Sequence, residues 1–131
     1  MAPQVSSPPE AHLQEARLLG RLLDLYEEER QIYVRILELS RDQGDRLRAG
    51  APLNQVRSLL EQKKNCLDMI SRLEKTEYRT KLQWEEGRHR WSASGRGRLH
   101  QMLRDVATLM ETIIHCEEQN DMVLIEQGGV L

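Results

Sequence analysis

The sequence contains no phenylalanine, and its aromatic residues are limited to two tryptophans and three tyrosines among 131 residues. With 31% charged residues, the hydrophobic core must consist mainly of leucine, isoleucine, valine and methionine, a composition typical of helical bundles and coiled coils. No apolar run approaches the length of about 18 residues that spans a bilayer, so we expect no membrane insertion. These absences favour an all-α fold.

The sequence also has few cysteines and a small net charge. Cys66 and Cys116 are the only cysteines and lie far apart in the chain. No secretory signal is recognisable, so we expect a cytoplasmic protein with reduced thiols and no structural disulfide. The formal net charge of -2 gives no global positive field that would attract nucleic acid or an anionic membrane. The charge is unevenly placed, because residues 79–104 carry seven Lys or Arg against two Glu, whereas residues 105–131 carry six acidic residues and no Lys or Arg.

The length of the chain suits a single domain. The first ten residues are rich in proline and serine and predict a disordered leader, residues 1–10. Helical spacing of apolar residues predicts three helices, at about residues 11–48, 52–86 and 98–127, followed by a short tail at residues 128–131. Gly50 and Pro52 suit a tight link between the first two helices. We therefore expect a long antiparallel hairpin with a third long helix, an elongated three-helix bundle or coiled coil.

Polar residues interrupt the apolar rows of two predicted helices. Glu29 and Gln43 occupy positions of the first helix at which aliphatic residues are expected, which favours control of helix register. Asn120 lies likewise on the apolar side of the third helix. Other apolar residues of that helix point away from this side: Ile114, Met122 and Ile125. This surplus of apolar surface has two interpretations of equal weight, ordinary bundle core and a docking face for a partner helix.

Candidate catalytic and metal-binding residues are few. Glu86 and His89 have the Glu-x-x-His spacing of di-iron bundles, but such a site needs that pair twice and two further glutamates, and the chain has one copy. The sequence has no Cys-x-x-Cys motif, nucleophile elbow or phosphate-binding glycine loop. We therefore expect no enzymatic activity and no cofactor.

The segment at residues 87–101 reads GRHRWSASGRGRLHQ and has two interpretations. Its arginines, with Trp84 and Trp91 as stacking platforms, would suit nucleic-acid binding. Its glycines and serines are typical of a connection between helices. The acidic helix that follows would repel phosphate, so we favour a connection that acts as a hinge for the third helix. The hinge is assigned to three glycines: Gly87, Gly95 and Gly97.

The order of these features resembles the FlgN-type flagellar export chaperones. The resemblance covers residues 18–127 and rests on an acidic first helix with EEE beside aromatic residues, a short turn, LLEQKK near the start of the second helix, and a last helix containing CEEQNDMVLIEQ. The chain departs from the family in its Gly/Arg-rich connection and in the methionine and isoleucine that stand where the family commonly repeats leucine after its asparagine.

The resemblance implies a small cytosolic chaperone of type III secretion. Such a protein binds the C-terminal segments of hook-filament junction proteins, prevents their premature assembly and delivers them to the flagellar export gate. It also implies that the last helix carries this client, around Val106, Met110, Ile113, Asn120, Val123 and Leu124; we add Leu103, where the apolar docking face begins. One alternative is a coiled-coil scaffold that oligomerises through the same apolar stripe. The other is nucleic-acid binding through the arginine-rich segment, which is less favoured, and we expect no nucleic-acid partner.

Overall fold

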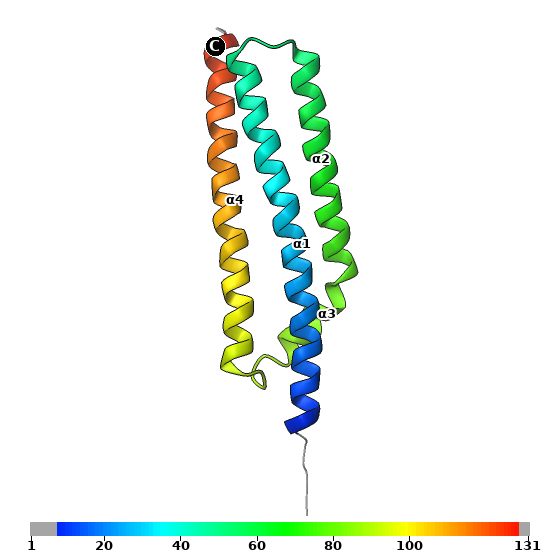
Figure 1. The fold of residues 1–131 in the computed structure, drawn as a ribbon. Helices are drawn as coiled ribbons and strands as arrows, with labels where there is room; N and C mark the ends of the chain where they lie inside the picture. Colours follow the sequence, from blue (N-terminus) through cyan, green and yellow to red (C-terminus); the bar gives the residue numbers. More distant parts are fainter. Residues whose placement is uncertain (1–7, 129–131) are drawn as a thin grey trace, which may run out of the picture.

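The computed structural model describes residues 8–128, which form four α-helices and no β-strand (Figure 1). The helices are α1 (Pro8–Arg48), α2 (Leu53–Thr76), α3 (Tyr78–Glu86) and α4 (Ala93–Gly128). The predicted all-α fold, with a long antiparallel hairpin followed by another long helix, is confirmed. Among the described helices, none has a stretch both long and apolar enough to cross a membrane.

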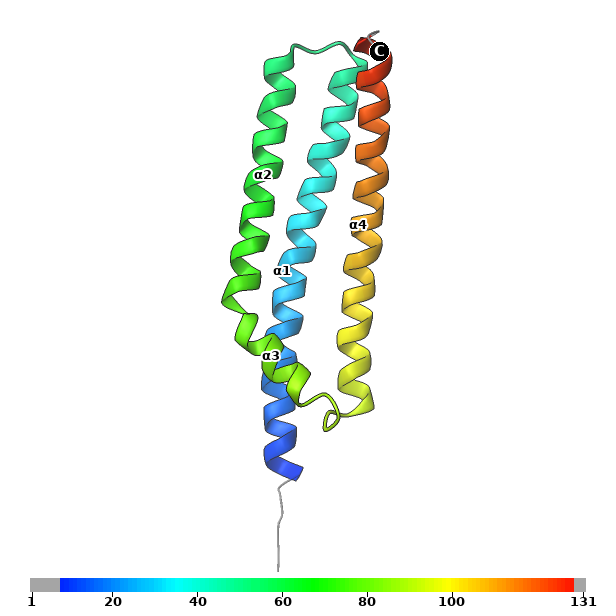
Figure 2. The same ribbon diagram turned by 180° about the vertical axis from the view of Figure 1, so that it is seen from behind.

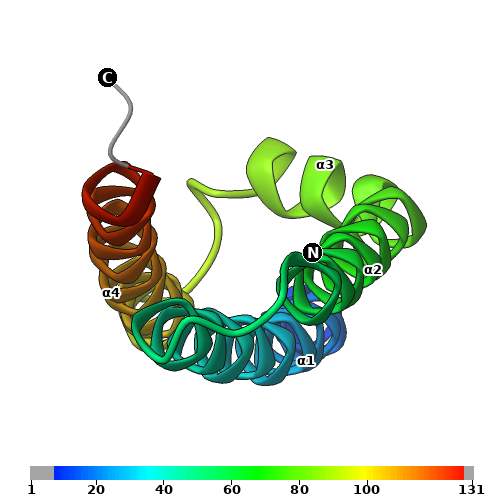
Figure 3. The ribbon, with the colours of Figure 1, turned by 90° about the horizontal axis from the view of Figure 1, so that it is seen from above.

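The central helix of the molecule is α1. Two adjacent apolar rows on α1 offer enough surface for two neighbours, and α2 and α4 pack on different sides of it while their own backbones stay apart. Seen along the helix axes, the three long helices form an arc rather than a closed bundle (Figure 3). The concave side of this arc is not covered by another long helix within residues 8–128.

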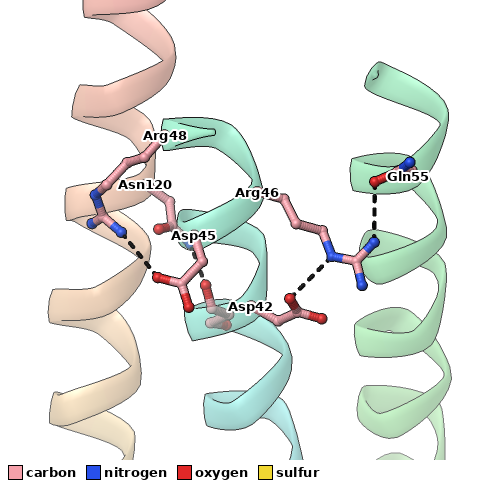
Figure 4. A network of polar contacts seen from close by, with 7 residues as sticks. Asp42, Asp45, Arg46, Arg48, Gln55 and Asn120 are labelled. Carbon is pink, nitrogen blue, oxygen red and sulfur yellow. Dashed lines mark hydrogen bonds and ion pairs between the residues drawn. The ribbon is translucent and has the colours of Figure 1, made fainter. Parts of the chain in front are cut away.

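Near its C-terminal end, α1 is joined to α2 by a tight turn (Figure 1) and to both neighbours by polar contacts (Figure 4). Gly50 has a φ of 72°, the left-handed conformation expected for it from the sequence. Arg46 of α1 donates a hydrogen bond of 3.2 Å to Gln55 of α2. On the other side of α1, Asn120 of α4 donates a hydrogen bond of 2.8 Å to the main-chain carbonyl of Ser40. These contacts set the relative heights of the three long helices.

The main hydrophobic core lies near the opposite end of the molecule, around the first half of α1. It consists of Leu18, Leu19, Leu22, Leu25, Trp84, Trp91 and Leu99. The rings of Trp84 and Trp91 stack with their centroids 5.2 Å apart, and the indole nitrogen of Trp91 donates a hydrogen bond of 2.7 Å to the main-chain carbonyl of Trp84. In a chain without phenylalanine, these two indoles are the largest rings of the core, and they attach α3 and the following loop to α1.

The second predicted helix, at residues 52–86, is interrupted. It ends as α2 at Thr76, and α3 turns away from α2 across one end of the arc toward α4 (Figure 2). At the break, the carboxylate of Glu77 pairs with Arg21 of α1 at 2.9 Å and accepts a hydrogen bond of 2.8 Å from Thr80. The change of direction brings Trp84 of α3 into the core beside α1.

The last helix begins earlier than predicted. It starts at Ala93 rather than near residue 98, because the hydroxyl of Ser92 accepts a hydrogen bond of 2.9 Å from the main-chain N–H of Gly95 and caps the helix. The glycines and serines of this segment had indicated a loop. Five residues of the predicted connection are therefore helical.

The chain ends agree only partly with the predicted boundaries. Helix α1 begins at Pro8 rather than near residue 11, so the last residues of the predicted leader are helical. The rest of that leader, residues 1–7, lies outside the described residues. Helix α4 ends at Gly128, close to the predicted end at residue 127, and the remaining tail also lies outside the described residues.

Candidate partner-binding groove

The three long helices form an arc (Figure 3). Side chains of α1, α2 and α4 together line a groove, with α1 as its floor and with α2 and α4 as its walls. Its upper part, toward the α1–α2 turn at the top of Figure 1, is a cavity of about 400 Å³, which is within the size range of ligand-binding pockets. The lining residues are Tyr33 and Ile36 of α1, Leu60, Lys63, Lys64 and Leu67 of α2, and Met110, Ile113, Ile114 and Glu117 of α4. Apolar side chains from three helices therefore meet around one cavity.

The walls of this upper cavity expose large apolar side chains. Leu67 is 54% exposed, Met110 is 40% exposed and Ile114 is 56% exposed. Single exposed apolar residues are common on protein surfaces, but a group that faces one cavity from two helices is typical of a binding surface. Covering apolar area contributes about 25 cal/mol per Å². A partner that filled the cavity would therefore be stabilised by these side chains.

A second cavity of about 720 Å³ continues the groove beside α3. Its apolar and aromatic lining consists of Leu22, Tyr26, Tyr78, Leu82, Trp84, Leu99 and Leu103. It is also lined by charged or titratable side chains, Glu74, Lys81, Glu85, Arg96 and His100. The lower cavity is thus amphipathic, whereas most of the side chains around the upper cavity are apolar.

A buried polar cluster lies at the upper end of the upper cavity. The ammonium group of Lys63 on α2 lies 2.6 Å from Oε1 of Gln43 on α1 and 2.5 Å from Oε1 of Glu117 on α4. The hydroxyl of Ser40 also donates a hydrogen bond to Glu117. Lys63 therefore links all three long helices. Gln43, a polar interruption of the apolar row, has a hydrogen-bond partner within the chain, as its predicted role in helix register requires.

A second polar cluster adjoins the lower cavity and consists of Glu29 of α1, Glu74 of α2 and Lys81 of α3, of which the last two line that cavity. Glu29 is only 4% exposed, lies within hydrogen-bond reach of the Glu74 carboxylate, and has no hydrogen-bond partner for its Oε2 atom among residues 8–128. Lys81 of α3 forms an ion pair with Glu74. Burial, and after it the neighbouring Glu74, raises the pKa of Glu29 from 4.5 to about 8.

The charge state of this cluster follows from those contacts. Burial raises the pKa of Glu74, but the hydrogen bonds from Glu29 and Lys81 outweigh this effect, and the net direction is downward. Two ionised carboxylates do not share a hydrogen bond, so Glu29 keeps its proton at neutral pH and donates it to Glu74. The charge of Glu74 is balanced by Lys81, and the cluster of three side chains is neutral.

Of the seven residues predicted to bind a client, three line the groove and two lie beyond its upper cavity. Leu103 lines the lower cavity, and Met110 and Ile113 line the upper cavity. Val123 and Leu124 lie beyond the upper cavity, toward the end of α4, and Leu124 is exposed. The structure thus brings three of the predicted residues to the groove itself.

The other two predicted client-binding residues, Val106 and Asn120, are buried against α1. Val106 is 6% exposed and Asn120 is 1% exposed, and Asn120 bonds to the main chain of Ser40. Gly44 of α1 permits this approach, because a Cβ atom at that position would come closer than 3.0 Å to Oδ1 of Asn120. Contacts within the chain therefore occupy both side chains while α4 lies on α1.

The predicted glycine hinge is a packed joint in the structure. A Cβ atom at Gly87 would overlap the ring of Trp91, and one at Gly95 would overlap the carboxylate of Glu15. Gly97 has open space around it but lies inside α4. Two of these glycines allow close packing, and Gly95 and Gly97 both lie within α4, so this packing favours a fixed joint over the predicted hinge. Glycine content alone does not distinguish close packing from flexibility.

The tryptophans proposed as platforms for nucleic-acid bases are not available to bases in this structure. Trp84 and Trp91 are both buried and stack on each other. Arg88 pairs with Glu85 at 2.6 Å, and the guanidinium of Arg90 lies over the Trp91 ring, 5.1 Å from its centroid. Trp91 of the arginine-rich segment and Trp84 of α3 therefore both belong to the hydrophobic core.

Sequence reasoning missed the part of the groove that lies outside α4. Leu60 and Leu67 of α2 form the facing wall, and Tyr33 of α1 contributes to the floor. The seven-residue spacing of the two leucines was a signal for a continuous apolar row. It did not indicate that the backbones of α2 and α4 stay apart.

Comparison of the chain with protein-family models, with curated proteins and with solved structures finds no significant match. Its function is therefore argued from the groove and from the resemblance noted in the sequence.

Proposed function

We propose that this protein is a cytosolic export chaperone of the FlgN type, whose groove binds a C-terminal amphipathic segment of a hook-filament junction protein. The observation that carries the proposal is the upper cavity, where exposed apolar side chains of α2 and α4 face each other across α1. Grooves of this kind bind amphipathic helices. Occupancy would prevent premature assembly of the client until it is delivered to the flagellar export gate.

The arc of the three long helices favours a client in helical form. A client helix lying between α2 and α4 would complete a four-helix bundle. From Leu22 in the lower cavity to Ile36 in the upper cavity, α1 rises by about 21 Å. A client helix of about 14 residues would therefore cover both cavities. A tail that is disordered when free would fold on binding, with the burial of apolar area offsetting the loss of conformational freedom.

Two matched substitutions on α2 test the groove. Leu67 is 54% exposed and Met69 is 48% exposed, but Leu67 lines the upper cavity whereas Met69 lies at a separate surface beside Cys66. We expect Leu67→Asp to weaken binding of a hook-filament junction C-terminal peptide at least about tenfold in titration calorimetry, because the client would bury an unpaired carboxylate. Met69→Asp should change the Kd less than about twofold. Equal losses in the two variants, or no binding by the unmodified protein, would refute the proposal.

A coiled-coil scaffold that oligomerises through the same groove is the second candidate, because another copy of the chain would also cover these apolar side chains. Sedimentation equilibrium separates the two functions. A stable oligomer that Leu67→Asp dissociates would support the scaffold, whereas a monomer that binds the peptide would support the chaperone.

A further inference from the structure

One row of α1 carries an acidic residue between two apolar residues at seven-residue spacing. Leu22, Glu29 and Ile36 follow one line of α1, about 10 Å apart along the helix axis, and all three are buried. Leu22 lines the lower cavity and Ile36 lines the upper cavity. Glu29 therefore occupies the middle level of this row, between two apolar residues and beside Glu74, which lines the lower cavity.

We propose that the groove selects a helix carrying a lysine or arginine at this middle level, with apolar residues one heptad to either side. This proposal rests on the proposed function and specifies the client. The cation would contact Glu74, whose side chain is 35% exposed and lines the lower cavity. The deeper Glu29 lies within hydrogen-bond reach of Glu74. Lys81 supplies one positive charge beside the two carboxyl groups of Glu29 and Glu74. A second cation would therefore neutralise the second negative charge when both carboxyl groups are ionised.

Among residues 8–128, the groups around Glu29 provide no second cation paired with the carboxyl groups of Glu29 and Glu74. Its titratable surroundings are Tyr26 and Tyr33 of α1, Glu74 of α2, Lys81 of α3 and, lining the adjoining lower cavity, Arg96 and His100 of α4. Lys81 is already paired with Glu74 and lies over the Tyr26 ring, 5.4 Å from its centroid. Arg96 donates a hydrogen bond to the main chain of Ser92. Within residues 8–128, therefore, Lys81 is the cation paired with these carboxyl groups.

A bound cation would also release the proton of Glu29. Burial and then the neighbouring Glu74 raise the pKa of Glu29 to about 8. A lysine or arginine beside Glu74 lowers this pKa, because a nearby positive charge favours the ionised form. Binding of a basic helix is then coupled to the release of up to about one proton, and its affinity rises as the pH increases toward 8.

Two designed peptides provide the test. Both are amphipathic helices of about 21 residues, or three heptads, with leucine in the apolar row. They differ only at the centre of that row, where one has lysine and the other has the uncharged norleucine. We expect the lysine peptide to bind the unmodified protein at least about tenfold more tightly near pH 8. We also expect its binding enthalpy to vary with the ionisation enthalpy of the buffer, which reports proton release.

Matched variants assign the proton to Glu29. Glu29→Gln should abolish the buffer dependence of the lysine peptide, because glutamine cannot release a proton. Glu28→Gln makes the same substitution at the adjacent exposed residue, which lies at a different surface, and should preserve both the lysine preference and the proton release.

The outcomes separate the two proposals. Equal affinities of the two peptides, or a buffer-independent enthalpy for the lysine peptide, would overturn the inference while leaving the groove as a docking site. Binding of neither peptide would overturn the groove assignment itself and the inference that rests on it.

Discussion

Replacing Gly87 by alanine tests whether the connection between α3 and α4 is a packed joint. Gly87 has a φ of -94°, which alanine adopts without strain, so packing alone decides the effect. The added Cβ atom would lie closer than 3.0 Å to three atoms of the Trp91 ring, and a rigid ring must move as a whole. Trp91 is 3% exposed, stacks on Trp84 and donates its indole N–H to the main-chain carbonyl of Trp84.

The expected magnitude follows from these contacts. Loss of the stack costs about 0.5–1.5 kcal/mol, and loss of the hydrogen bond costs about 1 kcal/mol. Alanine offsets up to about 1 kcal/mol by restricting the unfolded chain. We therefore expect Gly87→Ala to lower the free energy of unfolding by about 1–2 kcal/mol.

A second glycine provides the matched control. Gly97 lies within α4 and has nothing within 4 Å of an added Cβ atom, so Gly97→Ala should stabilise the protein by about 0.5–1 kcal/mol. Urea unfolding followed by far-UV circular dichroism measures both variants, and near-UV circular dichroism reports the tryptophans. If Gly87→Ala were as stable as the unmodified protein, or if both substitutions stabilised it equally, the packed joint would be refuted.

Two further substitutions probe buried polar groups. Gly44→Ala would place a Cβ atom closer than 3.0 Å to Oδ1 of Asn120, so urea unfolding should show a loss of about 1–3 kcal/mol, whereas Gly20→Ala, with open space around it, should show none. Glu29→Gln tests the raised pKa of Glu29. The folded state holds this proton more tightly than the unfolded state, so the stabilisation is complete below about pH 4.5 and is lost as the pH rises toward 8. The difference between 4.5 and about 8, at about 1.4 kcal/mol per pH unit, sets an upper limit of about 5 kcal/mol. The glutamine variant should lack this decline between pH 5 and about 8.5, and parallel profiles for the two proteins would contradict a neutral, buried Glu29.

The parts of the fold that depend on local sequence were predictable. The apolar periodicity of α1 predicted one long helix that ends at residue 48, although the helix starts earlier than predicted. Gly50 and Pro52 predicted the turn. Both predictions succeed because helical spacing and φ preferences act over a few residues. The break at Glu77 was not predictable in this way. It is accompanied by a pairing with Arg21, which lies 56 residues away in the sequence, and by the burial of Trp84 against α1.

Only part of the candidate site was visible in the sequence. Of the surplus apolar residues predicted on the last helix, Ile114 lines the upper cavity, whereas Met122 and Ile125 are exposed but do not line it. Periodicity identifies the apolar face of a helix but not the helix that covers it. The facing wall at Leu67 therefore required the structure, which shows that α2 and α4 both pack on α1 and leave a groove between them.

The two polar interruptions of the α1 apolar row differ in how their side chains are satisfied within the chain. Gln43 accepts a hydrogen bond of 2.6 Å from Lys63, which also pairs with Glu117, so the upper cluster is satisfied within the chain and serves helix register. Glu29 has an oxygen without a partner among the described residues. Protonation removes the charge of Glu29, and the proton is donated to Glu74. A cationic partner at Glu74 would balance the charge of an ionised Glu29. This contrast between two residues of one row supports the proposal that a basic residue of a partner helix is recognised at the level of Glu29 rather than at the upper end of the groove.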